Sequence, residues 1–235
     1  MTPFPEPRRL FVTANFALGA DGKVAARQGG SGFGSAADHR RLLERRAEAD
    51  AVLVGRSTLI ADRMGLALGS GNKLVDQRLA DGRPPFPARV VACFRHLPPT
   101  DHPLFRTPGG PIHLLTAAPH LAGAPFYGSE VTLHPLETPQ SLTDSLLALS
   151  LALGWKHLHC EGGPRLFRHL LAAGWIDRLD LTVTPRLIGG FGAPTLCGPS
   201  PQPHLPASIP LRLMSREAED GDTFLRYEIS GTRDS

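Results

Sequence analysis

The chain has 235 residues, a formal net charge of +3 and 41% hydrophobic residues, which is ordinary for a soluble globular protein. Only 2 Trp and 2 Tyr occur and the basic residues are not interleaved with aromatic ones, which argues against nucleic-acid binding. No stretch reaches about 18 consecutive apolar residues and no apolar leader opens the sequence, so we expect neither a membrane span nor a secretory signal.

The three cysteines, Cys93, Cys160 and Cys197, are an odd number without C-x-x-C spacing. This pattern predicts reduced thiols and a cytoplasmic protein. The metal signatures H-E-x-x-H and P-C-x-x-C are absent, so we expect no metal site. The P-loop, the Rossmann fingerprint and the G-x-S-x-G elbow are absent too, so a dinucleotide would have to be held in another way.

The N-terminal region begins with a buried strand at residues 10–17, in which Asn15 is the polar exception. A buried amide needs hydrogen-bond partners, so Asn15 either bridges structural groups or faces a ligand. The turn at residues 19–22 is followed by a Gly-rich loop at residues 29–34 that carries Phe33. This loop suits a lid over a pocket or a plain surface loop.

A helix should start at Ser35 and end near Glu48, because Ser35 and Asp38 have the spacing of a capping box. Its basic residues should mostly form a solvated face; they are Arg40, Arg41, Arg45 and Arg46. The second strand, at residues 50–54, leads into the turn Gly55-Arg56-Ser57-Thr58.

In this turn Ser57 or Thr58 can cap the next helix, and Arg56 stands where a phosphate would dock. Asp62 follows Thr58 by one helical turn and is either a solvated acid or a group that transfers a proton or binds substrate. Residues 63–88 are irregular apart from a short helix at 74–79, and so long a connection is usually functional or mobile.

Further strands are expected at residues 89–94, 112–115 and 131–133. Thr138 and Pro139 then form an N-cap and a first helical position. The apolar stripe at residues 142–153 predicts a helix that ends at Gly154.

The segment H-C-E-G-G-P-R-L at residues 159–166 lies between a buried strand and a helix. Pro164 suits the first helical position, and Gly162-Gly163 would let an anion approach the free N–H groups of the helix. We interpret this turn as a phosphate cradle for a nucleotide cofactor with Glu161 at its lip. The alternative is a tight turn that uses glycine for its positive φ angles.

The chain closes with a strand at residues 179–184 and an antiparallel hairpin of residues 211–218 and 224–229 around Asp220-Gly221. The alternation of strands and helices predicts an α/β fold with a mostly parallel sheet and helices on both faces. Ligands bind such sheets beyond the carboxyl ends of the strands, where both turns lie. We expect one domain from residue 1 to residue 235.

Four stretches together resemble the reductase domain of bacterial riboflavin biosynthesis, the C-terminal domain of a bifunctional deaminase-reductase in the dihydrofolate reductase-like superfamily. They are NFALGADGK at residues 15–23, RAEADAVLVGRSTLIAD at 46–62, EGGPRL at 161–166 and TPRLIGG at 184–190. The resemblance implies a three-layer α/β/α fold with a mostly parallel mixed sheet and an antiparallel C-terminal hairpin.

The resemblance also implies a homodimer that uses NADPH to reduce 5-amino-6-(5-phosphoribosylamino)uracil. Asn15 and Arg46 would then bind the substrate, and Glu161 and Asp62 would be the catalytic acids. Arg56 would meet the 2′-phosphate of the cofactor. The full set of expected cofactor-binding residues is Ala17, Phe33, Gly55, Arg56, Ser57, Thr58, Gly162, Gly163, Pro164 and Leu166.

The sequence departs from this family in its substrate region. Gly69 stands where the family has an Arg for the substrate phosphate, Gly19 replaces a Ser, and Phe33 replaces a pocket Trp. The phosphate would then be held by Arg46 or by a charge such as Lys73 or Arg78. Two alternatives therefore stay open, a reductase of a pterin or another heterocycle and a non-catalytic nucleotide-binding protein.

Overall fold

The computed structural model describes residues 10–25, 33–69, 71, 73–117, 124–125, 127–128, 130–138, 141–198, 205 and 207–229. Its strands are β1 (Phe11–Gly19), β2 (Ala51–Gly55), β3 (Ala88–Cys93), β4 (Ile112–Ala117), β5 (Val131–Leu136), β6 (His157–Cys160), β7 (Arg178–Thr184), β8 (Leu211–Glu219) and β9 (Asp222–Ile229). Its helices are α1 (Ala36–Glu48), α2 (Arg56–Ala61), α3 (Lys73–Ala80), α4 (Leu142–Leu153) and α5 (Pro164–Ala172), with a 3-10 turn at Pro103–Phe105.

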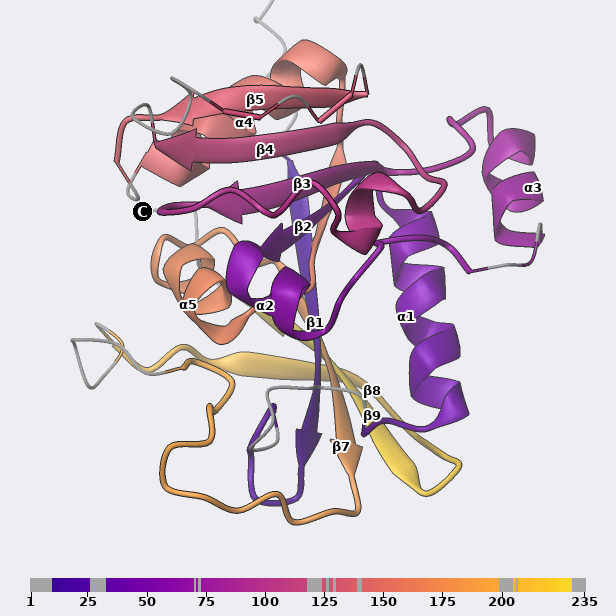
Figure 1. The fold of residues 1–235 in the computed structure, drawn as a ribbon. Helices are drawn as coiled ribbons and strands as arrows, with labels where there is room; N and C mark the ends of the chain where they lie inside the picture. Colours follow the sequence, from indigo (N-terminus) through magenta and orange to yellow (C-terminus); the bar gives the residue numbers. More distant parts are fainter. Residues whose placement is uncertain are drawn as a thin grey trace, which may run out of the picture.

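One sheet joins all of these strands in the order β5-β4-β3-β2-β6-β1-β7-β9-β8. Every neighbouring pair from β5 to β7 is parallel, whereas β9 runs antiparallel to both β7 and β8 (Figure 1). The hairpin turns at Asp220 and Gly221, whose φ angles of 53° and 83° suit a tight two-residue loop. The predicted mixed sheet with an antiparallel C-terminal hairpin is confirmed.

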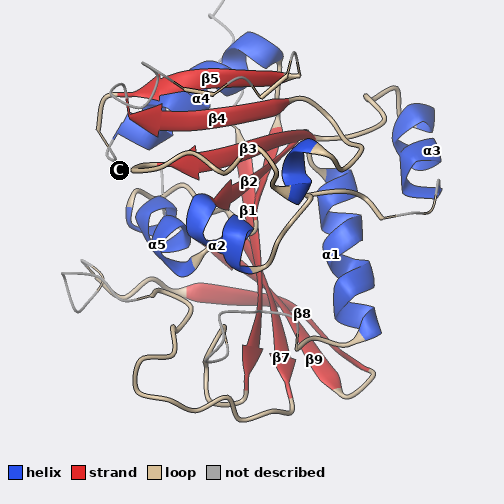
Figure 2. Cartoon of the chain, in the orientation of Figure 1, coloured by secondary structure: helices blue, strands red, loops and turns tan. Residues whose placement is uncertain are grey.

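Helices cover both faces of the sheet, which makes three layers (Figure 2). On one face the apolar sides of α4 and α5 pack on Leu53, Val90 and Leu158 in the larger core. On the other face Leu59 of α2 and Leu104 of the 3-10 turn pack on the strands of a smaller core. The parallel strands are buried on both faces, which explains their nearly continuous apolar sequences.

Two local predictions about helix starts need correction, and a third is confirmed. Gly55 is the N-cap of α2 and neither Ser57 nor Thr58 caps it. The N-cap of α4 is Ser141 rather than Thr138, and Pro139 lies outside the described residues. Ser35 does cap α1 by accepting a hydrogen bond from Asp38 N at 3.1 Å.

The reciprocal half of the capping box is replaced by a long-range contact. Ser35 N donates to Asp222 Oδ2 of β9 at 3.0 Å instead of to Asp38. β5 is longer than predicted and contains Pro135, which an edge strand tolerates. Within the described part of the chain, no helix combines the length and the apolar character needed to cross a membrane.

Candidate active site

A cleft of about 1010 Å³ opens at the carboxyl ends of the central strands. Its walls come from the end of β1, the first half of α1, the helix α2, the start of α5 and the segment 188–194 after β7. This is the edge where a parallel sheet binds ligands. Among the described residues that line it are three carboxylates, Asp38, Asp62 and Glu161, and one imidazole, His39. The described lining contains no Lys or Arg.

The two turns that the sequence singles out lie directly against each other in the cleft wall. Gly55 N, in the turn at residues 55–58, donates to Gly162 O at 2.7 Å, and Glu161 N donates to Leu53 O at 2.9 Å. Pro164 is the first residue of α5, so the free N–H groups of this helix start at the same edge. The predicted meeting of the two turns on one rim is confirmed.

The two glycines of the second turn are needed for different reasons. Gly162 has a φ of 82°, and a Cβ there would lie 2.8 Å from Cε1 of Phe16. Gly163 has an ordinary φ of −72°, but a Cβ there would lie 2.2 Å from Thr58 Oγ1. The positive φ belongs to Gly162, whereas Gly163 is constrained by the close approach of α2.

Glu161 lines the cleft, but both of its oxygens are bound by Arg46 from behind. Arg46 Nε donates to Oε1 at 2.5 Å and Nη2 donates to Oε2 at 2.8 Å. Arg46 Nη1 also donates to Ala67 O at 2.6 Å, and only 9% of the Arg46 side chain is exposed. Although burial lowers the pKa of Arg46, the Glu161 carboxylate more than compensates and raises it above its usual value. Arg46 therefore holds Glu161 and is not itself among the residues that line the cleft.

Two further acids face the cleft. Asp62 ends α2, as expected from its position one turn after Thr58. Asp38 in the first turn of α1 was not predicted as a site residue. Burial raises the pKa of Asp38; a hydrogen bond from Thr182 opposes this shift, and the charge of Asp222 adds to it. A carboxyl group with a raised pKa in a cleft is a candidate proton donor.

The predicted cofactor residues divide into two groups. Five of them line the cleft: Ala17, Ser57, Thr58, Gly163 and Pro164. The others do not: Gly55 and Gly162 shape the turns behind the wall, Leu166 is a buried core residue, and Phe33 and Arg56 lie outside the lining set. Arg56 Nε donates to Leu97 O at 3.1 Å. Residues 29–32 of the predicted lid lie outside the described residues.

The cations proposed for a substrate phosphate are not at the cleft. Only 1% of Arg78 is exposed, and it donates to the backbone oxygens of Ala47, Ala49 and Pro84, while burial lowers its pKa to about 10. Lys73 begins α3, which lies beyond α1 from the cleft (Figure 1). Arg46 is occupied by Glu161. The predicted roles of Arg46, Lys73 and Arg78 in binding phosphate therefore have no support in this geometry.

Asn15 lies in the cleft wall and also belongs to a chain of hydrogen bonds beneath it. His159 Nε2 is 3.1 Å from Asn15 Oδ1, and His159 Nδ1 is 2.8 Å from Thr13 Oγ1. Thr13 Oγ1 is in turn 2.9 Å from His157 Nε2, and His157 Nδ1 is 3.1 Å from Glu48 O. Asn15 is therefore a structural bridge that also lines the cleft, and its contact with a ligand stays a prediction. His157 and His159 are hydrogen-bonded through Thr13, which their alternation in the sequence could not reveal.

Known proteins are similar to this chain in sequence and in fold. Residues 10–225 match the family described as the RibD C-terminal domain. The chain belongs to this family. It is 28% identical over 232 residues to the 2,5-diamino-6-ribosylamino-4(3H)-pyrimidinone 5′-phosphate reductase of Methanothermobacter thermautotrophicus, covering 95% of this chain and 100% of that protein. It is 33% identical over 182 residues to the riboflavin biosynthesis protein RibD of Mycobacterium tuberculosis, covering 76% of this chain and 43% of that one.

Solved structures show the same fold. A pyrimidine reductase-like protein from Corynebacterium diphtheriae superposes with a TM-score of 0.78 at 23% identity, over 94% of this chain and 92% of that one. Dihydrofolate reductase from Enterococcus faecalis, complexed with NADP(H), superposes with a TM-score of 0.50 at 13% identity, over 94% and 97% of the two chains. The predicted dihydrofolate reductase-like fold and the resemblance to the RibD reductase domain are both confirmed.

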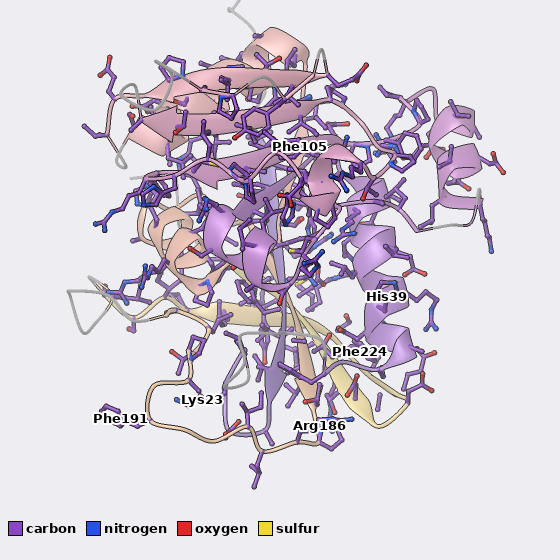
Figure 3. All side chains as sticks on the ribbon, in the orientation of Figure 1. Lys23, His39, Phe105, Arg186, Phe191 and Phe224 are labelled. Atoms are coloured by element: carbon purple, nitrogen blue, oxygen red, sulfur yellow. The ribbon has the colours of Figure 1, made fainter. Side chains whose placement is uncertain are left out.

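Several residues that line this RibD-family cleft were not predicted from the sequence. His39 and Leu42 of α1 line it with Asp38, and so do Gly189 and Gly190 after β7. Gly189 and Gly190 belong to the segment TPRLIGG at residues 184–190, which the resemblance to the family included. The sequence of this segment does not predict that it lines the cleft. Asp21 holds it there, because Asp21 Oδ2 accepts from Gly189 N at 2.7 Å. Lys23 and Phe191 lie on the loops at this end of the molecule (Figure 3).

Proposed function

We propose that this chain is an NADPH-dependent reductase of riboflavin biosynthesis that acts on a ribosylaminopyrimidine phosphate. The observation that carries the proposal is its match along the full length of a protein named as such a reductase. The cleft supports it, because this cleft lies where parallel sheets bind ligands and joins two backbone turns to three acids. The three cysteines of the chain, Cys93, Cys160 and Cys197, are free, which supports the further proposal of a cytoplasmic location.

Two forms of the pyrimidine are candidates for the substrate. The resemblance to the bifunctional protein favours the deaminated form, 5-amino-6-(5-phosphoribosylamino)uracil. The full-length relative is instead named for the 2,5-diamino form, and this chain spans 100% of that protein but 43% of RibD. We therefore propose the 2,5-diamino-6-ribosylamino pyrimidinone 5′-phosphate as the preferred substrate, with the uracil as the alternative.

The residues of the two turns fit a nicotinamide dinucleotide. The hydroxyls of Ser57 and Thr58 and the N–H groups at the start of α5 are neutral donors, which suit the phosphates of a cofactor. When bound, the cofactor would supply the hydride. The side chains of the cleft would orient the pyrimidine and exclude water around it. Cys160, next to Glu161 in the chain, is buried outside the lining of the cleft, and burial raises the pKa of its thiol to about 12.

The acids of the cleft would have separate tasks. Because both oxygens of Glu161 are held by Arg46, we propose that Glu161 accepts hydrogen bonds from the substrate and does not carry the proton. Asp62 stays the predicted proton-handling acid, and Asp38, whose pKa is raised by burial, is the second candidate. Asn15 would orient the pyrimidine.

The function is tested by following NADPH oxidation with the 2,5-diamino pyrimidine, with the uracil and with dihydrofolate as separate substrates. We expect turnover with the first and slower or no turnover with the others. General acid catalysis is typically worth roughly 10²–10⁴-fold, so Asp62→Asn and Asp38→Asn, assayed separately, identify the donor as the one that loses activity on that scale. Turnover of dihydrofolate alone would support a pterin reductase, and no turnover of any substrate would support a non-catalytic nucleotide-binding protein.

Arg56 provides a separate prediction about the cofactor. We expect wild-type protein to bind NADPH more tightly than NADH, because a charged contact to the 2′-phosphate is worth roughly 1.5–3 kcal/mol, or about ten- to a hundredfold. Arg56→Ala should remove most of this preference, whereas Arg216→Ala on the exposed strand β8 loses the same charge and should keep it. Calorimetric titration of both cofactors measures the ratio. Equal affinities in wild-type protein would remove the role given to Arg56.

A further inference from the structure

The chain of hydrogen bonds from Asn15 to Glu48 runs along β1 and β6, from the cleft to the C-terminal end of α1. Thr13 and His159 are completely buried, whereas Asn15 and His157 on either side of them are half-buried. β1 and β6 run in parallel with Thr13 opposite His159, which places the hydroxyl between the two imidazoles. Each member between Asn15 and Glu48 has one partner on either side, so the position of the hydrogen in one bond determines its position in the next.

The direction of this chain is set at its outer end. Glu48 O is a carbonyl oxygen and can only accept, so His157 Nδ1 carries a hydrogen. A neutral His157 then has no hydrogen on Nε2, and the Thr13 hydroxyl donates to it. The remaining lone pairs of Thr13 Oγ1 accept from His159 Nδ1, which leaves His159 Nε2 as an acceptor toward Asn15.

A protonated histidine ring donates from both nitrogens and would no longer fix this order of donors and acceptors. The surroundings of both rings disfavour protonation. His159 is fully buried and is faced by His157 and by the cations of Arg45, Arg46 and Arg178, so its pKa lies well below the usual value. Burial also lowers the pKa of His157, and the Arg178 charge acts in the same direction. The nearby groups Glu48 and Asp50 only partly oppose this shift. Both rings are therefore neutral at neutral pH.

Two acceptors cannot share a hydrogen bond, so the Asn15 atom that meets His159 Nε2 must be the amide nitrogen. A half-turn of the amide exchanges its nitrogen and oxygen at nearly the same positions. We propose that His159 is a positioning residue that turns the oxygen of the Asn15 amide toward the cleft. Asn15 then offers an acceptor to an N–H or amino group of the ligand. This last step rests on the proposed function, because an aminopyrimidine carries such donors.

The tautomer of His159 tests the proposal without any substrate. In protein with ¹⁵N-labelled histidine rings near pH 8, well above the usual histidine pKa of ~6.5, NMR distinguishes a nitrogen that carries hydrogen from one that does not. The His159 signal is assigned from through-space contacts to Thr13 or from its loss in His159→Gln. We expect hydrogen on Nδ1 and none on Nε2. Hydrogen on Nε2 of His159 would overturn the proposal.

Two variants of Thr13 make the test sharper. Thr13→Val keeps the shape of the side chain and removes the hydroxyl, so His159 should populate the form with hydrogen on Nε2. Thr13→Ser keeps the hydroxyl and should retain the wild-type tautomer. A wild-type tautomer in folded Thr13→Val protein would show that the chain does not control His159 and would overturn the proposal.

The kinetic consequence uses the same variants. In Thr13→Val the Asn15 amide would present its nitrogen to the ligand, so we expect the KM for the pyrimidine to rise about tenfold with little change in kcat. Serine should restore most of that loss. A changed tautomer with an unchanged KM would overturn the contact between the Asn15 oxygen and substrate. If no pyrimidine is reduced at all, the proposed function fails, while the NMR result still decides the role of His159.

Discussion

The ion pair between Glu161 and Arg46 changes the role that each residue has in the site. From the sequence both were expected to meet the substrate, Glu161 as a catalytic acid and Arg46 as a ligand. In the structure they are partners, with 3% of the Glu161 side chain and 9% of the Arg46 side chain exposed. A buried charge without its partner destabilises the folded state, so the main role of each residue is to neutralise the charge of the other.

We expect Glu161→Gln to lower the free energy of unfolding by roughly 3–5 kcal/mol, because it leaves the Arg46 charge buried and unpaired. Replacing both residues, in Glu161→Gln with Arg46→Met, should recover part of the loss. Urea denaturation measures both variants. Glu44→Gln is the control, since among the described residues Glu44 forms an exposed pair with Arg40 at 3.9 Å, and its replacement should cost less than about 0.5 kcal/mol. If Glu161→Gln is as stable as the wild type, the ion pair between Glu161 and Arg46 does not stabilise the fold.

At the scale of elements, the cleft depends on how closely α2 approaches the start of α5. The bond from Gly55 N to Gly162 O and the closeness of Gly163 to Thr58 hold the two turns together. α1 is fixed at the other side of the cleft, because Arg40 and Arg41 pair with Glu219 and Glu217 of β8, each at 2.7 Å. Arg41 also lies over the ring of Phe224, 4.0 Å from its centroid. The hairpin therefore positions the helix that carries Asp38.

Gly163→Ala tests the contact between the turns. Its Cβ would lie 2.2 Å from Thr58 Oγ1, so we expect a loss of roughly 1–3 kcal/mol in stability and weaker NADPH binding. Adding Thr58→Ala removes that oxygen and leaves the next atom at 3.6 Å, so the double variant should regain stability. Denaturation and cofactor titration follow both effects.

Gly71→Ala is the matched control for this experiment. A Cβ at Gly71 meets no atom within 4 Å and its φ is not positive, so the free energy of unfolding should stay the same or rise slightly. If Gly163→Ala behaves like this control, the close approach of α2 does not constrain the turn.

The whole molecule should lose stability in mild acid because of histidines that folding buries fully or in part. Burial is the largest cause of a lowered pKa in six of them, His102, His113, His134, His157, His159 and His169. The pKa of His113 falls to about 4. Below the usual value of ~6.5 the unfolded chain binds protons that the folded chain does not, so the stability present above that pH is lost as the pH falls.

We therefore expect the free energy of unfolding to fall by several kcal/mol between about pH 7.5 and about pH 5, since each unit of pKa shift is worth roughly 1.4 kcal/mol. Asp38 acts in the opposite direction, because its pKa is raised and its contribution is lost as the pH rises. Urea denaturation at several pH values measures the slope. A flat profile over this range would contradict the histidine account.

Assembly is also a property of the whole molecule. β8 is an edge strand of the sheet, and it exposes 44% of Leu211, 51% of Leu213 and 49% of Met214. Unpaired edges with apolar side chains favour pairing with another chain. We predict a homodimer that uses this strand, which light scattering at micromolar concentration should detect. Leu213→Glu should dissociate it, whereas a monomeric wild type would refute it.

The sequence by itself determined the elements, the fold class and the two turns. These follow from local chemistry, namely the apolar periodicity of the strands and helices, the Ser35 cap, Pro164 at the first helical position and the Asp220-Gly221 turn. The order of parallel strands and helices then placed both turns on one rim. The proposal of one domain from residue 1 to residue 235 remains a prediction, although one sheet joins all of the described strands.

Only the tertiary structure decided what individual side chains do. Arg46 and Glu161 are 115 positions apart in the chain, and Asn15 and His159 are 144 apart. No local pattern distinguishes Arg46, which is bound to a buried acid, from Arg40, which lies half-exposed on the same helix. Arg78 was likewise predicted as a possible phosphate ligand, but in the folded chain it donates to the backbone oxygens of Ala47 and Ala49. The partner of a charge or an amide depends on which distant strands and helices are brought together, and this depends on packing of the whole chain.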